Sequence, residues 1–238
     1  MTASNLAETL AVRPPLALVR DTRTTEPEAE GARRALNVAV AAIGLVLAAP
    51  VLVVVAAMIK LTSAGPVFFV QDRVGLDRRD PAKDAGNDRR QVDLGGKPFR
   101  IFKFRTMFVQ KQSEQVWASP DDPRVTSVGR VLRKYRLDEL PQLINVLLGD
   151  MNIVGPRPEQ PKIVVDLQQQ INAYNMRHKV RPGITGWAQI NHHYDRSIED
   201  VRRKVSLDLE YIRRQSLSED LKIMLRTVPV VVLRKGGW

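Results

Sequence analysis

ALNVAVAAIGLVLAAPVLVVVAAMIKL, residues 35–61, is an almost unbroken apolar run, and it decides the fold class of this chain. About 20 apolar residues suffice to cross a bilayer core of about 30 Å as a helix, so the run is long enough to enter a membrane. Pro50 lies near its middle. Because proline lacks a backbone donor and clashes with the preceding turn, it kinks or breaks a helix. The limb before Pro50, about 15 residues at about 1.5 Å each, is too short to span the core by itself.

Positive charges flank this run on both sides. Arg33 and Arg34 precede it, and the cations that follow it are Lys60, Arg73, Arg78 and Arg79. A helix that spans a membrane normally has its Lys and Arg excess on one side. Excess on both sides is typical of a hairpin that enters the bilayer and returns to the same face. A buried core helix is the remaining alternative, which the length and uniform apolarity disfavour. The residues alone leave spanning and re-entrant topologies open.

The composition limits the chemistry that the chain can perform. None of the 238 residues is cysteine, which excludes disulfides, thiolate metal sites and cysteine nucleophiles. With only three histidines, a zinc site or a catalytic triad centred on histidine is disfavoured. Carboxylates are therefore the best candidates for acid–base or covalent chemistry.

The net charge is +11 and lies in one part of the chain. Residues 1–34 hold as many acidic residues as arginines, so the whole excess lies beyond residue 34. A basic body of this kind suits nucleic acid, an anionic membrane surface or a phosphorylated substrate. Aromatic residues make up only 5% of the chain, and no aromatic-basic RNA-binding motif occurs. Nucleic acid is therefore the weakest of the three partners.

The rest of the chain mixes β-like and helical patterns, which predicts a helix-rich α+β fold. Residues 1–34 have little periodicity and are predicted to be disordered. Two β-like runs, 65–75 and 97–107, flank a polar loop at 76–96. Helical patterns occur at 124–136, 160–178, 196–214 and 218–234. The first of these helices has one basic and one apolar face, so it either packs on its own domain or lies in a membrane interface.

An acidic pair, Asp138 and Glu139, lies in RLDELPQLINVLLGD, residues 136–150. A helix is predicted to begin at Asp138 or just before it and to run to Leu148, with Pro141 in its first turn and Gly149 as its natural end. This places the pair at a helix N-terminus, where free N–H groups attract anions. The alternative is structural: Asp138 caps the helix, and Glu139 neutralises nearby arginines.

Arg157 lies between two prolines in GDMNIVGPRPE, residues 149–159. A guanidinium on such a restricted backbone is suited to a bidentate grip on phosphate, although a surface ion pair explains it equally well. The turn RPGITGWAQIN, residues 181–191, either holds a planar ligand or closes a core. Composition does not separate these interpretations.

Five motifs together carry a family resemblance: GPVFFVQDRVG, FKFRTM, LDELPQLINVLLGDM, VGPRP and RPGITGWAQIN. In this order they resemble the bacterial sugar transferase family, the monotopic phosphoglycosyl transferases, over about residues 33–234. The family attaches a sugar phosphate to a polyprenyl phosphate carrier. The N-terminal extension and the loop at 76–96 are less typical. The chain looks like a compact member, without the four-helix membrane domain that precedes this core in larger relatives.

The resemblance implies a role for the acidic pair. The aspartate matching Asp138 attacks the β-phosphorus of a nucleoside diphosphate sugar, and polyprenyl phosphate then attacks the resulting aspartyl-phosphosugar. Glu139 belongs to the same dyad and organises the site. Mg²⁺ is the implied cofactor, with Asp138 and Glu139 as its ligands. Arg157 fits a phosphate clamp, and the weaker candidates for phosphate binding are Arg105, Arg136 and Arg181.

The resemblance also favours the re-entrant topology. The family's apolar segment enters the cytoplasmic leaflet and returns, broken at a Ser-Pro pair that is Ala49-Pro50 here. The family's basic motif with a following Asp appears as Arg33, Arg34 and then Asn37. Both departures are expected to weaken anchoring contacts. We expect a monotopic membrane protein with a disordered extension (1–34), a re-entrant membrane helix hairpin (35–61), a cytoplasmic-face catalytic domain (62–238) and interfacial amphipathic helices.

The implied function is a phosphoglycosyl transferase that performs the first membrane step of exopolysaccharide, capsule, O-antigen or glycoprotein glycan assembly. The partners that the resemblance implies are a nucleoside diphosphate sugar, with uridine as the family's usual nucleoside, polyprenyl (undecaprenyl) phosphate and the lipid bilayer. Nucleic acid is not an expected partner. The expected location is the bacterial inner membrane. A homo-oligomer is compatible with these features, and no residue decides the oligomeric state, the sugar or the base. The competing hypothesis is a catalytically silent membrane scaffold for glycan-assembly enzymes.

Overall fold

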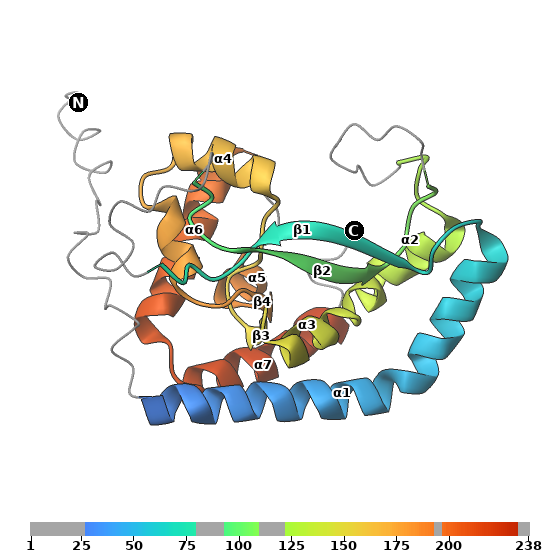
Figure 1. The fold of residues 1–238 in the computed structure, drawn as a ribbon, viewed down its shortest axis with the longest axis horizontal. Coiled ribbons are helices and arrows are strands. Elements are labelled where there is room, and N and C mark those ends of the chain that lie inside the picture. The colour runs from blue at the N-terminus through green and yellow to red at the C-terminus, as the bar shows by residue number, and fades with distance from the viewer. Residues whose placement is uncertain (1–26, 80–92, 110–121, 193–196, 233–238) are drawn as a thin grey trace, which may run out of the picture.

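The computed structural model describes residues 27–79, 93–109, 122–192 and 197–232, and over these residues the chain is a helix-rich α+β protein (Figure 1). The predicted fold class is confirmed at this level. Most of the extension predicted to be disordered (1–26) and most of the predicted polar loop (80–92) lie outside the described residues.

Helix α1 (Pro27–Thr62) is the first element and contains 36 residues. It begins well before Ala35, so the end of the segment predicted to be disordered is helical. Glu28 and Glu30 lie in the first turn, where negative charge stabilises a helix N-terminus. The predicted boundary was therefore too late, because these polar residues continue the helix without contributing to the apolar pattern.

Pro50 lies inside α1 and does not end it. Figure 1 shows that α1 runs along the base of the molecule and then bends sharply upward in its second half. Proline causes such bends because its ring clashes with the preceding turn and because it removes one backbone hydrogen bond. Pro50 was predicted to kink or to break the helix. In the structure it kinks the helix, and α1 stays one continuous bent helix.

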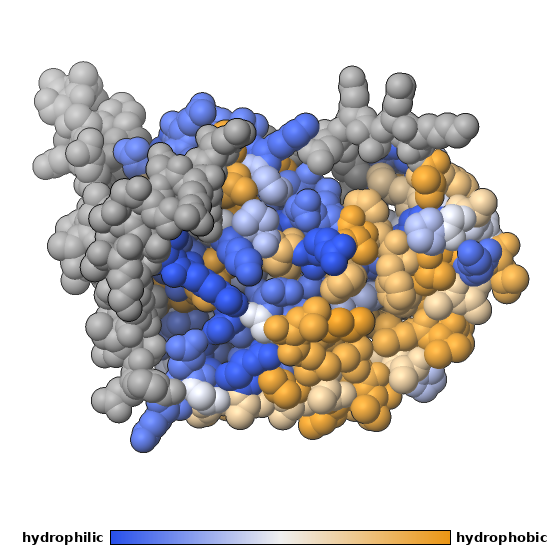
Figure 2. Space-filling model, in the orientation of Figure 1, coloured by the Kyte–Doolittle hydropathy of each residue, from blue (hydrophilic) through white to orange (hydrophobic). Residues whose placement is uncertain are grey.

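Most of the apolar surface of α1 is uncovered. Residues Glu28–Thr62 are long and apolar enough to cross a membrane, and only 11% of their most apolar window is buried. The exposed apolar side chains of α1 are Ile43, Val46, Leu47, Val51, Val53, Val54, Met58 and Leu61. Figure 2 shows a broad hydrophobic area at the lower right, where the second half of α1 lies in Figure 1. The helix is thus compatible with membrane association.

Two small sheets follow α1. Strands β1 (Phe68–Val74) and β2 (Pro98–Phe104) pair antiparallel, with Phe68 opposite Phe104 and Val74 opposite Pro98. Strands β3 (Asn152–Val154) and β4 (Gly183–Thr185) pair in parallel. The two β-like runs of the sequence are therefore confirmed as the antiparallel pair.

Helices surround these sheets. The helices after β2 are α2 (Ser127–Lys134), the 3₁₀ turn η5 (Leu137–Glu139), α3 (Gln142–Leu148), α4 (Pro161–Gln170), the 3₁₀ turn η6 (Tyr174–Lys179), α5 (Trp187–Asn191), α6 (Ile198–Arg214) and α7 (Leu217–Val232). Helix α3 ends as predicted, because Gly149 follows it with a φ of 87°, a conformation that glycine adopts without strain.

Two clusters of buried apolar residues form the interior. The larger lies between the strands, α4, α6 and α7 and includes Val74, Val154, Val164, Tyr211 and Ile223. The smaller joins the second half of α1 to β2 and α2 and consists of Val55, Ile59, Phe104, Val128 and Leu132. Helix α2 therefore packs on its own domain, while its Val131 stays exposed.

Polar contacts fix the first half of α1 to the domain. The Arg33 guanidinium forms an ion pair of 2.8 Å with the buried Asp220 carboxylate of α7. Fully buried Asn37 accepts a hydrogen bond of 2.6 Å at Oδ1 from the backbone N–H of Ile153. Replacement of the family's aspartate by Asn37 was expected to weaken anchoring, but an amide oxygen accepts this hydrogen bond as a carboxylate would.

Candidate active site

A 3₁₀ turn carries the acidic pair. Arg136 adopts the left-handed conformation with a φ of 53°, and η5 follows it with Asp138 and Glu139. Helix α3 begins only at Gln142, with Pro141 at its N-cap. A helical turn thus begins at Leu137, just before Asp138, but it is a 3₁₀ turn, the α-helix itself begins only at Gln142, and Asp138 is not an N-cap. Proline has no N–H to give to a helix ladder and suits a helix start, so the α-helix begins after it.

Three cations surround the Glu139 carboxylate. Lys103 of β2 places its Nζ 2.9 Å from Oε1. Arg157, in the loop after β3, donates from Nη2 to Oε1 at 2.6 Å and from Nη1 to Oε2 at 3.3 Å. Arg136 lies 3.7 Å from Oε2. Both oxygens of this buried carboxylate are therefore occupied, and three segments far apart in the sequence are held together.

Asp138 is in a different state. Among the residues that the structure describes, none forms a hydrogen bond or an ion pair with its carboxylate. Burial raises the pKa of Asp138 to about 6, and the charge of adjacent Glu139 raises it as well. The positive charges of Lys103, Arg157 and Arg133 oppose this rise. Asp138 is thus mostly ionised at neutral pH but lacks the partners that would hold it.

The pKa of Glu139 is shifted downward, opposite to the shift of Asp138. Burial on its own would raise the pKa of this carboxyl, but the charges of Arg157 and Lys103 and the hydrogen bond from Arg157 hold the pKa well below its usual range. Glu139 is therefore charged at neutral pH and serves as a counter-ion to these cations. Two adjacent carboxylates with pKa values pushed apart are typical of a site in which they have separate roles.

A second buried ion pair supports Arg157. Arg177 donates from Nη2 to the backbone oxygen of Arg157 at 3.0 Å and to Asp208 Oδ2 at 2.7 Å. The prediction that the Arg157 backbone has little freedom agrees with these contacts. Its guanidinium pairs with Glu139, yet its side chain is 32% exposed, so part of it still faces the surface.

Two of the predicted phosphate-binding residues lie elsewhere. Arg105 is buried, and its guanidinium donates to the backbone oxygens of Ser63 and Ala64 just after α1. Arg181 donates to the Gly149 oxygen and pairs with Glu30 in the first turn of α1. Both side chains fasten an end of α1, so neither is brought onto the acidic pair. Of the predicted arginines, the structure brings Arg136 and Arg157 to it.

Ala49 and Pro50, the predicted break in the membrane segment, are both exposed on α1. No hydrogen bond of a described side chain reaches the backbone there. The bend in α1 therefore has no polar clamp among the described residues and depends on the proline itself.

Lys103 was missed by the sequence analysis, which took Arg105 from the same FKFRTM motif. A usable signal was present: Lys103 lies between Phe102 and Phe104 in a strand, where an ammonium group must find a counter-charge if it is buried. Burial lowers the pKa of Lys103, and the charge of Glu139 counters that effect. Which acidic residue would pair with it could not be deduced from spacing.

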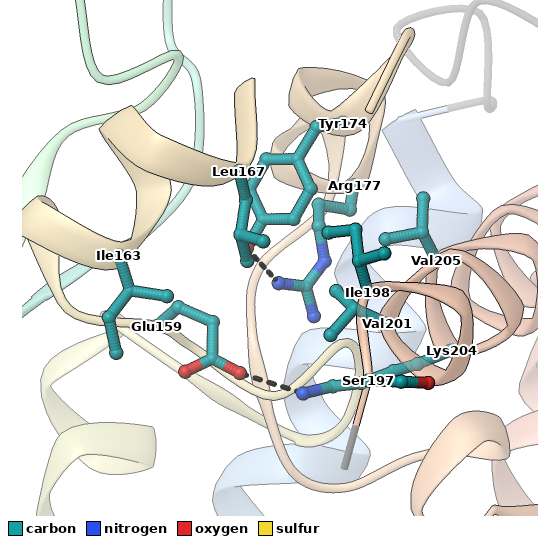
Figure 3. A pocket seen from close by; sticks show the side chains of 10 residues that line it. All are labelled: Glu159, Ile163, Leu167, Tyr174, Arg177, Ser197, Ile198, Val201, Lys204 and Val205. Atoms are coloured by element: carbon teal, nitrogen blue, oxygen red, sulfur yellow. Dashed lines mark hydrogen bonds and ion pairs between the residues drawn. The ribbon is translucent and has the colours of Figure 1, made fainter. Parts of the chain in front are cut away.

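A pocket of about 350 Å³ lies beside this site, between α4, η6 and α6 (Figure 3). Its walls are largely apolar, and its charged groups are already paired. Glu159 binds Lys204 at 2.8 Å, as the dashed line in Figure 3 shows, and it lies 3.6 Å from Arg73. The pocket is linked to the acidic pair through Arg177, which lines it and binds the backbone of Arg157.

The oxygen atoms of the acidic pair are the candidate ligands for the predicted magnesium ion. Mg²⁺ prefers oxygen ligands, and it is often held by one or two carboxylates together with substrate phosphates and waters. Within the described residues, no cluster of three or more metal-ligating side chains occurs. Glu139 has both oxygens occupied by cations, whereas the Asp138 oxygens have no partner. The residues fit an ion that shares its ligands with a bound diphosphate, with Asp138 as the available protein ligand.

Comparison with known proteins gives one consistent result. A family model described as bacterial sugar transferase matches residues 28–234. A UDP-N-acetylgalactosamine-undecaprenyl-phosphate N-acetylgalactosaminephosphotransferase of Aeromonas hydrophila is 41% identical over 206 residues, covering 86% of this chain and 44% of that protein. A UDP-glucose:undecaprenyl-phosphate glucose-1-phosphate transferase of Escherichia coli is 44% identical over 199 residues, covering 82% of this chain and 39% of that protein.

A relative of more similar length also matches. A UDP-glucose:undecaprenyl-phosphate glucose-1-phosphate transferase of Caulobacter vibrioides is 42% identical over 209 residues, covering 87% of this chain and 72% of that protein. The chain therefore spans about two fifths of the length of the first two relatives and nearly three quarters of the third.

Proposed function

The chain belongs to the bacterial sugar transferase family, and from this membership and the geometry of the acidic pair we propose that it transfers a sugar phosphate from a UDP-sugar to undecaprenyl phosphate. The relatives named above differ in their sugar, N-acetylgalactosamine in one and glucose in two. Exopolysaccharide or a related cell-surface glycan is the proposed destination of the transferred sugar.

Two adjacent carboxylates with unequal partners carry this proposal. A covalent mechanism needs an anionic nucleophile that is free to reach phosphorus, and it needs fixed positive charge beside it. Asp138 supplies the first, since no described residue binds its oxygens. Lys103, Arg157 and Arg136 supply the second, since Glu139 holds them next to Asp138. A silent scaffold would not need the unpaired carboxylate.

The proposed reaction has two half-steps at Asp138. A carboxylate oxygen forms a bond to the β-phosphorus of the UDP-sugar, the bond from that phosphorus to the bridging oxygen breaks, and UMP leaves with the electron pair. An oxygen of undecaprenyl phosphate then forms a bond to the same phosphorus, and the bond to Asp138 breaks, which restores the carboxylate. The exposed part of Arg157, together with Arg136, binds phosphate oxygens.

Magnesium is part of the proposal. When bound, the ion neutralises charge on the diphosphate and thereby lowers the repulsion between two anions. Of the acidic pair, Asp138 is the member with free oxygens to ligate it, and Glu139 supports the site through the cations that it fixes.

We also propose that both ends of α1 lie on one side of the membrane, the cytoplasmic face of the inner membrane. Support comes from the contacts of its two ends. Arg33 near the start binds Asp220, and Arg105 binds the oxygens of Ser63 and Ala64 just after the end. A helix that spanned the bilayer would separate these ends by about 30 Å of lipid, and the same domain could then not bind both.

The function is tested with the purified protein in nanodiscs, UDP-sugars and undecaprenyl phosphate. UMP is the expected by-product, and without undecaprenyl phosphate we expect a sugar-phosphate adduct on the intact protein by mass spectrometry, mapped to Asp138. Release of UDP would instead indicate transfer of the sugar without its phosphate. Failure of a well-folded protein to release UMP from any UDP-sugar tried would favour the scaffold hypothesis.

The topology is tested by labelling single cysteines, which is clean because the native chain has none. Glu28 and Ala64 are exposed at the two ends of α1, and neither forms a side-chain contact described above. Glu28→Cys and Ala64→Cys should both react with an impermeant maleimide only when it reaches the cytoplasmic side. Labelling of either site from the periplasm would establish a spanning helix.

A further inference from the structure

The pocket between α4, η6 and α6 (Figure 3) has one charged side and largely apolar walls. The charged side is formed by Glu159, Arg177 and Lys204. Its volume of about 350 Å³ is at the small end of the range of ligand pockets, about 300–1,000 Å³. The pocket therefore suits one part of a nucleotide sugar better than the whole molecule. The apolar side chains that line it are Ile163, Leu167, Tyr174, Ile198, Val201 and Val205.

The charged side of the pocket is connected to the acidic pair. Glu159 follows Arg157 by two residues, so their Cα atoms are at most about 7 Å apart. The Arg157 guanidinium in turn binds the Glu139 carboxylate at 2.6 Å. Arg177 reaches the same loop, since it donates to the Arg157 oxygen at 3.0 Å. One short loop segment therefore joins the pocket to the acidic pair, and a nucleoside diphosphate likewise has its base at one end and its β-phosphorus at the other.

Arg73 of β1 adds a second cation to this charged side. Its Nη1 lies 3.6 Å from the Glu159 carboxylate, which also pairs with Lys204 at 2.8 Å. Burial lowers the pKa of Arg73, and the charges of Glu159 and Arg157 shift it in opposite directions, so this guanidinium lies near both the pocket and the Arg157 loop. Two cations thus share one carboxylate, which leaves positive charge beside the pocket for an anion such as a phosphate.

The pocket lies away from the exposed apolar surface of the chain. In Figure 1, α4 and α6 lie at the upper left and the second half of α1 lies at the right, and the broad hydrophobic area of Figure 2 lies at the lower right. Undecaprenyl phosphate carries its phosphate on a long apolar chain that stays in the bilayer, so it approaches from the side of α1. The pocket is therefore left to the water-soluble substrate, the UDP-sugar.

The walls of the pocket favour the base of that substrate over its sugar. A hexose carries hydroxyl groups around its ring, and against apolar side chains each of them loses hydration without gaining a partner. Uracil has two apolar ring faces and carries its polar atoms only on the ring edge. It can therefore be held between the aliphatic side chains of α4 and α6 with its edge toward the charged side.

We propose that this pocket is the nucleoside subsite of the enzyme, which takes the uracil and ribose of the UDP-sugar while the diphosphate extends along the charged side toward Asp138. The inference rests on the proposed function. In this arrangement the α-phosphate lies beside Arg73 and the exposed part of Arg157, and the β-phosphorus reaches the Asp138 carboxylate. The nucleoside is held equally in the ground state and the transition state, so the pocket contributes to KM and not to kcat.

The test fills the pocket in the full chain in nanodiscs. Ile163 of α4 is half-buried and lines the pocket, so Ile163→Trp places a larger side chain there. It should weaken the binding of UMP at least tenfold by calorimetry and raise KM for UDP-sugar at least tenfold, with kcat within threefold of the native value. The KM for undecaprenyl phosphate should stay within twofold. Val165→Trp is the matched control and should behave like the native chain, because Val165 is half-buried on the same helix and does not line the pocket.

Other results would overturn the assignment. Unchanged binding of UMP with a raised KM for UDP-sugar would assign the pocket to the sugar, and a raised KM for undecaprenyl phosphate alone would assign it to the lipid carrier. Native behaviour of Ile163→Trp, or an equal loss in Val165→Trp, would show that the pocket is not the nucleoside subsite. If Ile163→Trp does not fold, Ile198→Trp replaces it, because Ile198 lines the pocket from α6 and is 39% exposed.

The native protein is assayed in parallel for UMP release and the covalent adduct. Absence of both would refute the proposed function, and the assignment of the pocket would fall with it. Their presence, together with native binding of UMP by Ile163→Trp, would refute only the assignment of the pocket.

Discussion

Two buried clusters of arginine and carboxylate lie close together and differ in one respect. In the cluster of Arg177 and Asp208, the side chains are 2% and 3% exposed, and the two charges pair with each other. In the cluster around Glu139, Lys103 and Arg157 pair with that carboxylate, and the adjacent Asp138 is left over. The first cluster is complete as a piece of structure. In the second cluster, the Asp138 carboxylate has no partner until a ligand binds it.

The difference indicates where stability and reactivity separate. A fully paired buried ion pair loses stability when either partner is removed, since the other charge is then uncompensated. Removing the charge of an unpaired buried carboxylate should instead leave the stability unchanged or raise it, because ionisation of that group inside the fold is already unfavourable. The raised pKa of Asp138 therefore means that its charge destabilises the folded state at pH values above the pKa of an unfolded aspartate.

The largest effect is expected for Asp138→Asn. Turnover should fall at least about 1,000-fold, equivalent to about 4 kcal/mol in the activation barrier, because the nucleophile is removed. The melting temperature should stay the same or rise, because the removed charge is one that burial disfavours. UMP release and thermal unfolding in nanodiscs measure both. Asp166→Asn, on the exposed surface of α4, is the matched control and should behave like the native chain. An active Asp138→Asn variant would contradict the covalent mechanism.

Arg177→Met should have the largest effect on stability. Breaking a buried ion pair costs about 3–5 kcal/mol, because Asp208 would keep an uncompensated charge or take up a proton. Burial raises the pKa of Asp208 even beside Arg177, which indicates how much the carboxylate depends on this partner. Denaturant unfolding measures the loss.

The double variant Arg177→Met with Asp208→Leu sharpens this prediction. It removes both charges and should recover most of the stability. If the double variant is as unstable as Arg177→Met alone, the contact of Arg177 with the Arg157 backbone, and not the ion pair, holds this region together.

Glu139→Gln should have a smaller effect on stability, about 2 kcal/mol, since Arg157 is partly exposed and water can compensate its charge. The low pKa of Glu139 means that its contribution to stability is present above the pKa of an unfolded glutamate and is lost as the pH falls toward the folded value. Thermal unfolding at neutral pH and at about pH 3, below the pKa of an unfolded glutamate, would measure it. A Glu139→Gln variant as stable as the native chain at neutral pH would show that the three cations need no counter-ion.

The smallest expected effect is on the pH dependence of the reaction rate. Asp138 must be ionised to attack, and its pKa is raised to about 6. The rate should therefore fall below pH 6 and reach about a tenth of its plateau one pH unit lower. Because the charge of Glu139 raises the pKa of Asp138, residual activity of Glu139→Gln should persist to lower pH. An acid limb that does not move between the two proteins would mean that another group controls the rate.

Part of the site was predictable because its residues are adjacent in sequence. Asp138, Glu139, Arg136 and Arg157 come from two short motifs, and the structure brings them together. Arg105 and Arg181 were predicted by the same reasoning from charge and rigidity, and they bind backbone oxygens near the ends of α1 instead. An arginine in a motif offers the same donors to a phosphate and to a carbonyl, so the sequence does not distinguish them.

The sequence by itself determined that the chain has a long apolar helix with a proline near its middle, two β-strands and an acidic pair. These features depend on runs of neighbouring residues: the length of 35–61, the β-like patterns of 65–75 and 97–107, and the adjacency of Asp138 and Glu139. Local sterics and hydrophobicity act over such distances, and they leave a visible pattern.

Only the tertiary structure decided which carboxylate is bound and which is free. Lys103 lies 36 residues before Glu139 and Arg157 lies 18 residues after it, and both form their ion pair with Glu139 and not with Asp138. The left-handed turn at Arg136 and the late start of α3 at Gln142 set the directions of the two side chains. Coulombic pairing depends on distances in space, and in the sequence these two carboxylates are one position apart with the same charge.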